Sequence, residues 1–372
     1  MRLMTNRRAL PVAAAGLAAA LLLGACSSSG SGGGSSSSAG GGSSGAASSG
    51  KPPHETIGYV DIAASGGMQK RWYNFLTAAA KPLGWTVKMT DANGVASTAL
   101  QGVQSYVSQG VNAIIISCVD TGPLVPGLAA AKAANIPVIA LGCEVPPPTN
   151  LYSATYAENE QSLATSLNNY LNKALKAKTC QQVAVLQDNT ILVGRERSTY
   201  FINALKGSGF NIVATPVIPE TSIVPSTTTA ISATLAAQPG TCAFVPAFDF
   251  SVGPAVAELQ ALGKSSTVGV YSYYADDVNL PLLRKPNSAL QAVVDGPVEQ
   301  VSLVAIDQLL AHFMKGAVID PSAASSLTVP FTVFTKANAP ANPAGYITPW
   351  SISTYLTPYL QKWNSTYNLK LR

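Results

Sequence analysis

The chain has 372 residues, of which 47% are hydrophobic and 11% are charged, so it has enough apolar material for one large globular domain or two ordinary ones. The formal net charge is +5, but Arg2, Arg7 and Arg8 lie in a segment that we expect to be removed, which leaves 20 basic against 18 acidic residues. This near balance gives no electrostatic reason to expect a nucleic-acid partner.

The first 25 residues have the three parts of an export signal: a basic start, an apolar core at 11–23 and a small pair before Cys26. The core is too short to span a bilayer, which favours a cleaved signal peptide at 1–25 over an anchor helix. The sequence Leu-Gly-Ala-Cys at 23–26 resembles a bacterial lipobox, whose cysteine becomes the acylated first residue; the alternative is an ordinary signal peptide with a chance cysteine. Residues 26–53 are rich in Ser and Gly and are predicted to form a disordered tether from acylated Cys26.

Short apolar runs then alternate with segments of helical periodicity. The predicted strands are 56–60, 85–89, 113–117 and 137–141, and the predicted helices are 68–84, 95–110 and 124–136. Parallel neighbours in a sheet need a long crossover, so this alternation predicts βαβ units and a parallel sheet. A ligand site is expected beyond the carboxyl ends of such strands.

After a further run at 151–156, the alternation begins again. The predicted strands are 181–187, 210–218, 243–248, 267–272 and 289–295, and the predicted helices are 157–177, 192–209, 226–238, 252–263 and 297–316. The stretch 276–287 is expected to be irregular. Two similar five-strand halves predict two α/β lobes with parallel sheets, and the run 329–335 is expected to be an edge strand.

Four cysteines follow the predicted tether. Cys118 and Cys143 each follow a strand, and Cys180 and Cys242 each precede one. If the strands are neighbours, about 4.8 Å apart, each pair has a spacing that suits a disulfide. The alternative is buried free thiols. A metal site is not expected, because the chain has no CxxC and only two histidines.

Several segments, in this order, resemble the type I periplasmic binding proteins of the ribose-binding kind, relatives of the lac-repressor ligand core. They are TIGYV at 56–60, QGVNAIIIS at 109–117, AAKAANIPVIAL at 130–141, the Arg-Glu-Arg triplet at 195–197 and AVAELQALGK at 255–264. The resemblance implies two Rossmann-like lobes, a hinge of three crossings near 152–156, 295–297 and 323–328, and a ligand cleft between the lobes. It implies an N-terminal lobe of 54–154 plus about 296–325, a C-terminal lobe of 155–295 plus about 326–336, and an extension at 337–372.

The resemblance also implies ligand contacts, residue by residue. The predicted contacts of the first lobe lie in the loop and helix after the first strand and at two later strand ends: Ala64, Ser65, Met68, Gln69, Trp72, Tyr73, Ser117 and Gly142. Those of the second lobe are Arg197, Phe248, Asp249, Ser272 and Tyr273, and Asp295 lies at a crossing. Trp72 equally fits the apolar face of its helix, and the second-lobe aromatics equally fit core packing. The alternative for Arg197 is a surface arginine paired with a neighbour such as Glu196, and the alternative for Asp249 and Asp295 is a capping or hinge position.

Departures from the family pattern concern the charged groups that hold a sugar. Gly142 and Cys143 replace an Asp-Arg pair, Ala247 and Phe248 replace Asn-Asp, and aromatics surround Ser272 where an aspartate is usual. The ligand is therefore expected to be either a sugar or polyol, or a less polar, aromatic or acidic solute. In the acidic case Arg197 would bind the carboxylate.

The predicted function is capture of a small molecule by a monomeric, lipid-anchored extracytoplasmic binding protein and delivery to the permease and ATPase of an ABC importer, without a cofactor. An enzyme is disfavoured because the chain has no GxSxG, HExxH or phosphate-binding glycine loop. A transcription regulator is disfavoured because an export signal stands where a DNA-binding domain would. A ligand sensor for a membrane receptor kinase is a further alternative.

Overall fold

The computed structural model describes residues 52–143, 150–325, 327, 329–341 and 350–372. The predicted signal peptide, the lipidation site Cys26 and nearly all of the predicted tether lie outside the described residues. Within the described part of the chain, no helix is long and apolar enough to cross a membrane.

The first lobe contains a five-stranded parallel sheet in the order β2-β1-β3-β4-β5. Its strands are β1 (Thr56–Asp61), β2 (Thr86–Asp91), β3 (Ala113–Ser117), β4 (Val138–Gly142) and β5 (Ala154–Ala157). Strands β3 and β4 are buried along their whole length, as expected for a parallel sheet covered on both faces.

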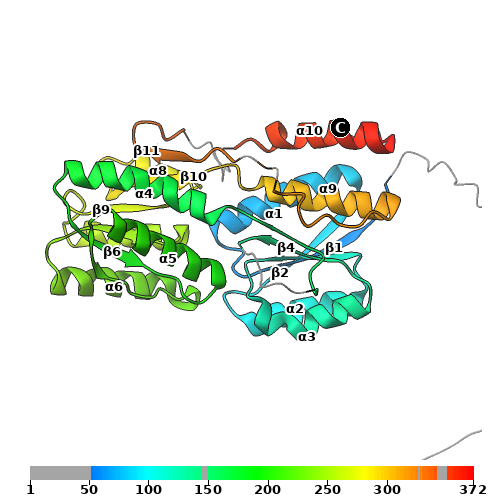
Figure 1. Ribbon diagram of the computed structural model, residues 1–372, viewed down its shortest axis with the longest axis horizontal. Helices are drawn as coiled ribbons and strands as arrows, with labels where there is room; N and C mark the ends of the chain where they lie inside the picture. Colours follow the sequence, from blue (N-terminus) through cyan, green and yellow to red (C-terminus); the bar gives the residue numbers. More distant parts are fainter. Residues whose placement is uncertain (1–51, 144–149, 326, 328, 342–349) are drawn as a thin grey trace, which may run out of the picture. The chain divides into compact units, whose positions relative to one another are not determined.

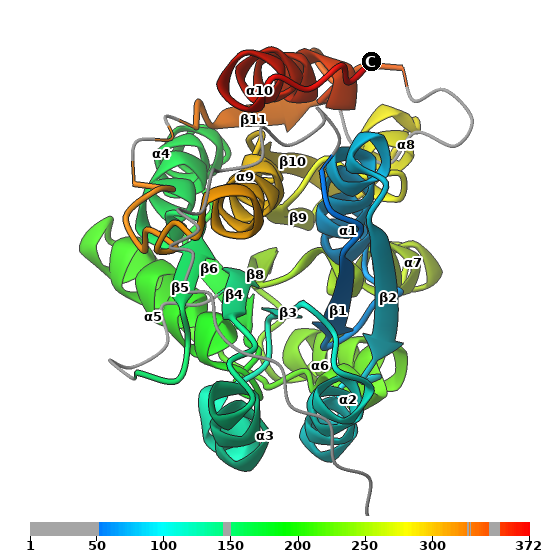
Figure 2. The same cartoon turned by 90° about the vertical axis from the view of Figure 1, so that its right-hand side faces the viewer.

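Helices cover both faces of the first sheet. Helix α1 (Gly67–Ala80) lies on one face with α9 (Gln300–Lys315), and α2 (Ala96–Gln109) and α3 (Thr121–Ala133) lie on the other (Figure 2). The apolar face predicted for the first helix is confirmed, because Met68, Trp72, Phe75, Leu76, Ala79, Ala80 and Leu83 are all buried. The short 3-10 helix η1 (Lys81–Leu83) continues α1.

The second lobe contains a six-stranded sheet in the order β11-β10-β9-β8-β6-β7. Its strands are β6 (Gln182–Leu186), β7 (Asn211–Ala214), β8 (Thr241–Pro246), β9 (Gly269–Tyr273), β10 (Leu290–Asp295) and β11 (Thr332–Thr335). The predicted edge strand is confirmed as β11, which pairs antiparallel with β10 and is the sixth strand of this sheet beside five parallel ones.

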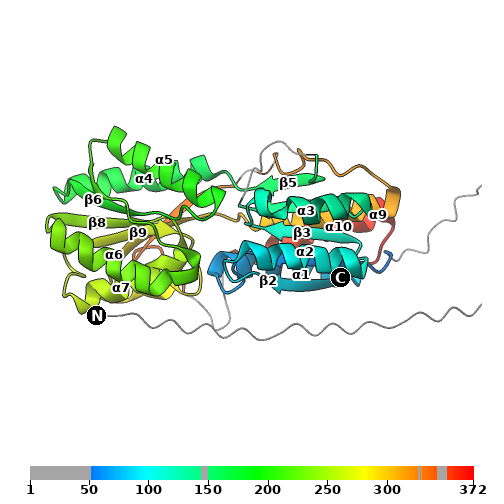
Figure 3. The same cartoon turned by 90° about the horizontal axis from the view of Figure 1, so that it is seen from below.

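Helices α4 (Glu160–Ala177) and α5 (Leu192–Gly207) lie on one face of the second sheet, and α6 (Ile223–Ala237) and α7 (Val252–Ala261) lie on the other (Figure 3). The 3-10 helices η2 (Glu220–Ser222) and η3 (Asp249–Ser251) precede α6 and α7. One prediction is wrong here: the stretch expected to be irregular contains α8 (Asn279–Arg284), which packs on β10.

The chain passes between the lobes after β5, after β10 and again between α9 and β11. Strand β5 pairs with β4 up to Ala157, so the first passage begins a few residues after the boundary predicted at 154/155. After β11, helix α10 (Ile352–Tyr367) lies beside α9 (Figure 1). Trp363 of α10 is buried there, and its indole N–H donates to Asp307 of α9 at 2.8 Å.

Candidate functional site

The carboxyl ends of both sheets face each other, and residues at these ends make contacts between the lobes. Asp120, just after β3, accepts the N–H of Leu192 at 2.7 Å and pairs with Arg195 at 3.0 Å, both in α5. On the other side, Asp249 of η3 lies against the backbone N–H of Met68 at the start of α1. The residues around these contacts form the candidate site.

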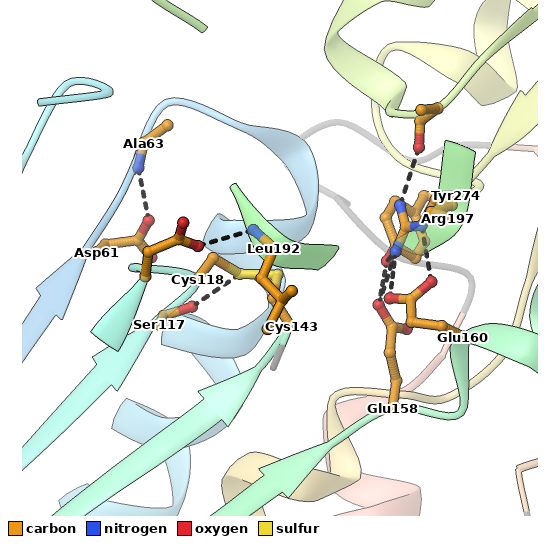
Figure 4. Close-up of a disulfide and its surroundings, with 12 residues drawn as sticks. Asp61, Ala63, Ser117, Cys118, Cys143, Glu158, Glu160, Leu192, Arg197 and Tyr274 are labelled. Carbon is orange, nitrogen blue, oxygen red and sulfur yellow. Dashed lines mark hydrogen bonds and ion pairs between the residues drawn. A yellow bond between two sulfur atoms is a disulfide. The ribbon is translucent and has the colours of Figure 1, made fainter. Parts of the chain in front are cut away.

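Asp61, at the end of β1, is the most buried carboxyl group of the first lobe at this site. It accepts a hydrogen bond from the N–H of Ala63 at 2.9 Å (Figure 4). It also accepts one from the hydroxyl of Tyr59 at 2.8 Å. Asp91, its neighbour on β2, accepts the N–H of Ala64 at 3.1 Å. Burial raises the pKa of Asp61 to about 7, and the charge of Asp91 adds to this shift.

The predicted contacts after β1 differ in exposure. Ser65 is exposed, Ala64 and Tyr73 are half-buried, and Met68, Gln69 and Trp72 are buried. The Tyr73 ring lies 5.5 Å from that of Tyr59. Two buried polar atoms here, Oε1 of Gln69 and Nε1 of Trp72, have no hydrogen-bond partner in the protein.

A disulfide joins Cys118 and Cys143 beyond β3 and β4, with Cα atoms 4.9 Å apart, which confirms the predicted pairing (Figure 4). Ser117 and Gly142, which precede these cysteines, are fully buried or nearly so. A Cβ on Gly142 would lie 2.6 Å from the Trp72 ring, and φ is +87° there, so glycine is required at this strand end. The second predicted disulfide, Cys180–Cys242, is also formed, beside the amino ends of β6 and β8.

Arg197, predicted to reach into the cleft, is fully buried and bonded through all three of its nitrogens. It pairs with Glu160 at 2.6 Å and Glu158 at 3.1 Å, and it donates to the Tyr274 hydroxyl at 2.8 Å and the Ala247 carbonyl at 3.1 Å (Figure 4). Burial, and next the charge of Glu160, raises the pKa of Glu158 well above its usual range. Arg197 is therefore held by its own chain, and its role as a ligand contact stays a prediction.

The other residues predicted in the second lobe lie close to Arg197. Its guanidinium carbon is 4.5 Å from the centre of the Phe248 ring and 4.2 Å from that of Tyr273. Ser272 is buried and donates to the Pro246 carbonyl at 3.0 Å, which ties β9 to β8. Asp249 contacts the carboxyl group of Asp276, and a Cβ on Gly67 of α1 would lie 2.4 Å from Asp276 Oδ2.

Arg71 was missed by sequence reasoning, although it fixes α1 to the second crossing. Its guanidinium is fully buried and pairs with Asp295 at 2.8 Å and Glu299 at 2.6 Å. Asp295 also accepts the N–H of Ala275 at 2.7 Å. Asp295 was predicted as a ligand contact with a hinge position as the alternative, and the structure places it in this hinge ion pair.

In the ranges that the structure describes, no group of three or more His, Cys, Asp or Glu side chains is placed to hold a metal ion. Three other features bear on the type of protein: two α/β lobes, strand ends that face each other, and several passages between the lobes. The pattern of the periplasmic binding protein domain matches residues 57–316.

The chain belongs to the periplasmic binding protein family. The predicted family and fold are thus confirmed. Among curated proteins, the galactofuranose-binding protein YtfQ of Escherichia coli (strain K12) is 27% identical over 154 residues, which make up 41% of this chain and 48% of that protein. The chain thus matches about half the length of this relative.

Solved structures of periplasmic binding proteins share the fold. A galactofuranose-binding protein superposes with a TM-score of 0.66 at 19% identity, covering 83% of this chain and 99% of that one. A carbohydrate transporter solute-binding protein from Agrobacterium radiobacter, in complex with D-arabinose, has a TM-score of 0.66 at 18% identity, covering 77% and 95%. A 5-methylthioribose transporter solute-binding protein from Thermotoga lettingae TMO has a TM-score of 0.65 at 19% identity, covering 76% and 86%.

This periplasmic binding protein also has a cavity of about 680 Å³ beside the passages between its lobes. Its lining includes Glu158, Glu160 and Glu196 together with Val301 and Phe331. Glu158 and Glu160 also bind Arg197, so the cavity lies beside these ion pairs, and neither Asp249 nor Met68 lines it.

Proposed function

We propose that the protein is a lipid-anchored extracytoplasmic solute-binding protein that captures a sugar or polyol-like molecule between its lobes. It delivers this solute to the permease and ATPase of an ABC importer. The observation that carries the proposal is the set of contacts across the cleft. Met68 meets Asp249 on one side and Asp120 meets Leu192 and Arg195 on the other, and both contacts would form as the lobes close.

A solute favours closure by the difference between its binding free energies for the closed and the open states of the protein. A solute that contacts both lobes stabilises the closed state by the contacts that it lacks in the open one. The buried polar atoms without partners at the site, in Gln69 and Trp72 of the first lobe, supply an acceptor and a donor for hydroxyl groups. A flat indole also suits the C–H face of a sugar ring.

The proposed class of solute is based on the names of similar proteins. YtfQ is named a galactofuranose-binding protein, and the Agrobacterium protein is bound to D-arabinose. The proposed lipid anchor is based on Cys26. The Ser/Gly-rich segment after it would form a flexible tether between the membrane surface and the folded part of the protein.

A thermal-shift screen against pentoses, hexoses and polyols tests this proposal. A solute at about 100 times its Kd is expected to stabilise the folded protein by about 2.7 kcal/mol, which raises Tm by several degrees. Tryptophan fluorescence should change with the same solutes, since Trp72 lies at the site. If no sugar or polyol changes either signal, the proposed solute class is wrong.

A further inference from the structure

We propose that the solute held between the lobes carries a positive charge, such as the ammonium group of an amino sugar or amino polyol, and that carboxyl groups around Glu220 bind it. This inference rests on the proposed function, because it names the class of solute for the same site. The acidic cluster is defined as Asp61 and Asp120 of the first lobe with Asp188, Glu220 and Asp249 of the second.

Glu220 places this cluster at the boundary between the lobes. It begins η2, and a Cβ on Gly94, in the loop after β2, would lie 3.3 Å from Glu220 Cβ. The charges of all four other members act on Glu220, that of Asp188 most strongly. The carboxyl groups of both lobes therefore gather at one place when the lobes are in contact.

The arginines of this region are already paired. Arg71 binds Asp295 and Glu299, Arg197 binds Glu158 and Glu160, and Arg195 binds Asp120. The salt bridges of the described residues include no lysine or arginine paired with Asp61, Asp188, Glu220 or Asp249. Four carboxyl groups of the acidic cluster thus form no salt bridge of their own; the charges of Arg195 and Arg197 act on Asp188 and that of Arg197 on Asp249, whereas no cation of the described residues acts on Asp61 or Glu220.

Two oxygens of the cluster have no donor. Asp188 is 2% exposed, and its Oδ1 accepts the N–H of Thr190 at 2.8 Å, but its buried Oδ2 has no partner. Oε1 of Glu220 is also buried without a partner. A buried carboxylate oxygen without a donor is costly, and an ammonium group brings three donors with its charge.

Protons take the place of a cation in the solute-free cluster. Burial, and next the charge of Asp188, raises the pKa of Glu220 to about 8, and burial raises that of Asp61 to about 7. At pH 7 Glu220 is mostly protonated and Asp61 about half protonated, and a bound ammonium group would displace these protons. A carboxylate solute brings neither a positive charge nor hydrogen-bond donors to the carboxyl oxygens that lack them, so the acidic-solute alternative is disfavoured.

Titration calorimetry at pH 7 with matched pairs of solutes tests the proposal. The pairs are D-galactose and D-galactosamine, D-glucose and D-glucosamine, and sorbitol and 1-amino-1-deoxysorbitol, which differ by one ammonium group. For the pair that binds, we expect the amine to bind at least about tenfold more tightly than the neutral member. This preference should fall as salt is added.

Two variants separate charge from shape. Asp188→Asn combined with Glu220→Gln should remove at least about tenfold of the amine preference and leave binding of the neutral member almost unchanged. Glu258→Gln is the matched control, since Glu258 lies on α7 of the same lobe and bonds Ser232 outside the cluster. It should keep the full preference.

The outcomes distinguish this inference from the function on which it rests. If neutral sugars bind as tightly as the amines, or if the double variant keeps the preference, the charged-solute inference is overturned and solute capture stands. If no member of any pair binds, the proposed function fails and the inference fails with it. An amine preference lost only in the double variant supports both.

Discussion

Replacing Arg197 by methionine is expected to lower the free energy of unfolding by about 3–5 kcal/mol, because it leaves two buried carboxylates without their cation. Glu158 and Glu160 both bind this guanidinium, and Arg197 and Glu158 are almost wholly removed from solvent. Urea unfolding with a constant m-value would measure the loss.

The loss in Arg197→Met should depend on pH. Without the guanidinium, burial still holds the folded-state pKa of Glu158 above its unfolded value, so the folded state binds more protons. Stability then falls as pH rises between the two values, and the deficit should be larger at pH 8 than at pH 5. Arg195→Met is the control, because this side chain is 41% exposed and its pair with Asp120 is worth about 1 kcal/mol or less. Equal losses in the two variants would contradict the stabilising role given to the buried ion pairs of Arg197 with Glu158 and Glu160.

Gly67→Val is expected to weaken solute binding about 10- to 100-fold, because overpacking a tight contact costs about 1–3 kcal/mol. Gly67 lies in the first turn of α1, and its new Cβ would meet Asp276 Oδ2 of the other lobe at 2.4 Å. Asp276 cannot easily move, because its other oxygen accepts the N–H of Asn279 at 2.6 Å. The substitution would thus act as a wedge against closure, and calorimetry with a solute that binds the wild type would measure it.

The matched control for this wedge is Gly122→Val, in the first turn of α3, where a Cβ meets nothing within 4 Å. It should bind solute like the wild type. Gly67→Val should also keep the wild-type melting temperature to within a few degrees, since it clashes only when the lobes meet. Unchanged affinity in Gly67→Val would mean that the lobes do not close through this contact.

The sequence predicted the parts of the fold that depend on local pattern. Apolar runs such as 113–117 and 137–141 are buried on both faces, so their composition alone identifies central parallel strands. Both disulfides followed from the same pattern, because cysteines at equivalent ends of neighbouring strands are close. Helix α8 was missed because it is one short helix with an internal Pro281 next to charged residues.

The polar side chains at the site depend on contacts between distant parts of the chain. Arg71 lies between Lys70 and Trp72 on a helix whose polar positions read as a solvated face, yet its partners Asp295 and Glu299 are 224 and 228 residues away. Glu220 likewise begins the short 3-10 helix η2, and it gains its importance only where the charges of Asp188 and Asp61 act on it. No local signal in the sequence distinguishes such residues from ordinary surface charges.

The residues that the family resemblance predicted as ligand contacts mostly lie near the site, but several of them form hydrogen bonds or ion pairs with other residues of this chain. Ser272 bonds Pro246 and Asp295 bonds Arg71, so both support the structure around the cleft. A pattern carried over from relatives gives the position of a residue in the fold. It does not give the rotamer or the partner, which the neighbouring residues of this chain determine.

The most direct test of the central claim is a crystal structure of the protein purified from its host with its natural solute bound. We expect the solute to be enclosed between the lobes, in contact with the residues after β1 and with the acidic cluster, and the contact between Asp249 and Met68 to be present. Solute found instead in the hinge-side cavity lined by Glu158 and Phe331, with none between the lobes, would contradict the account.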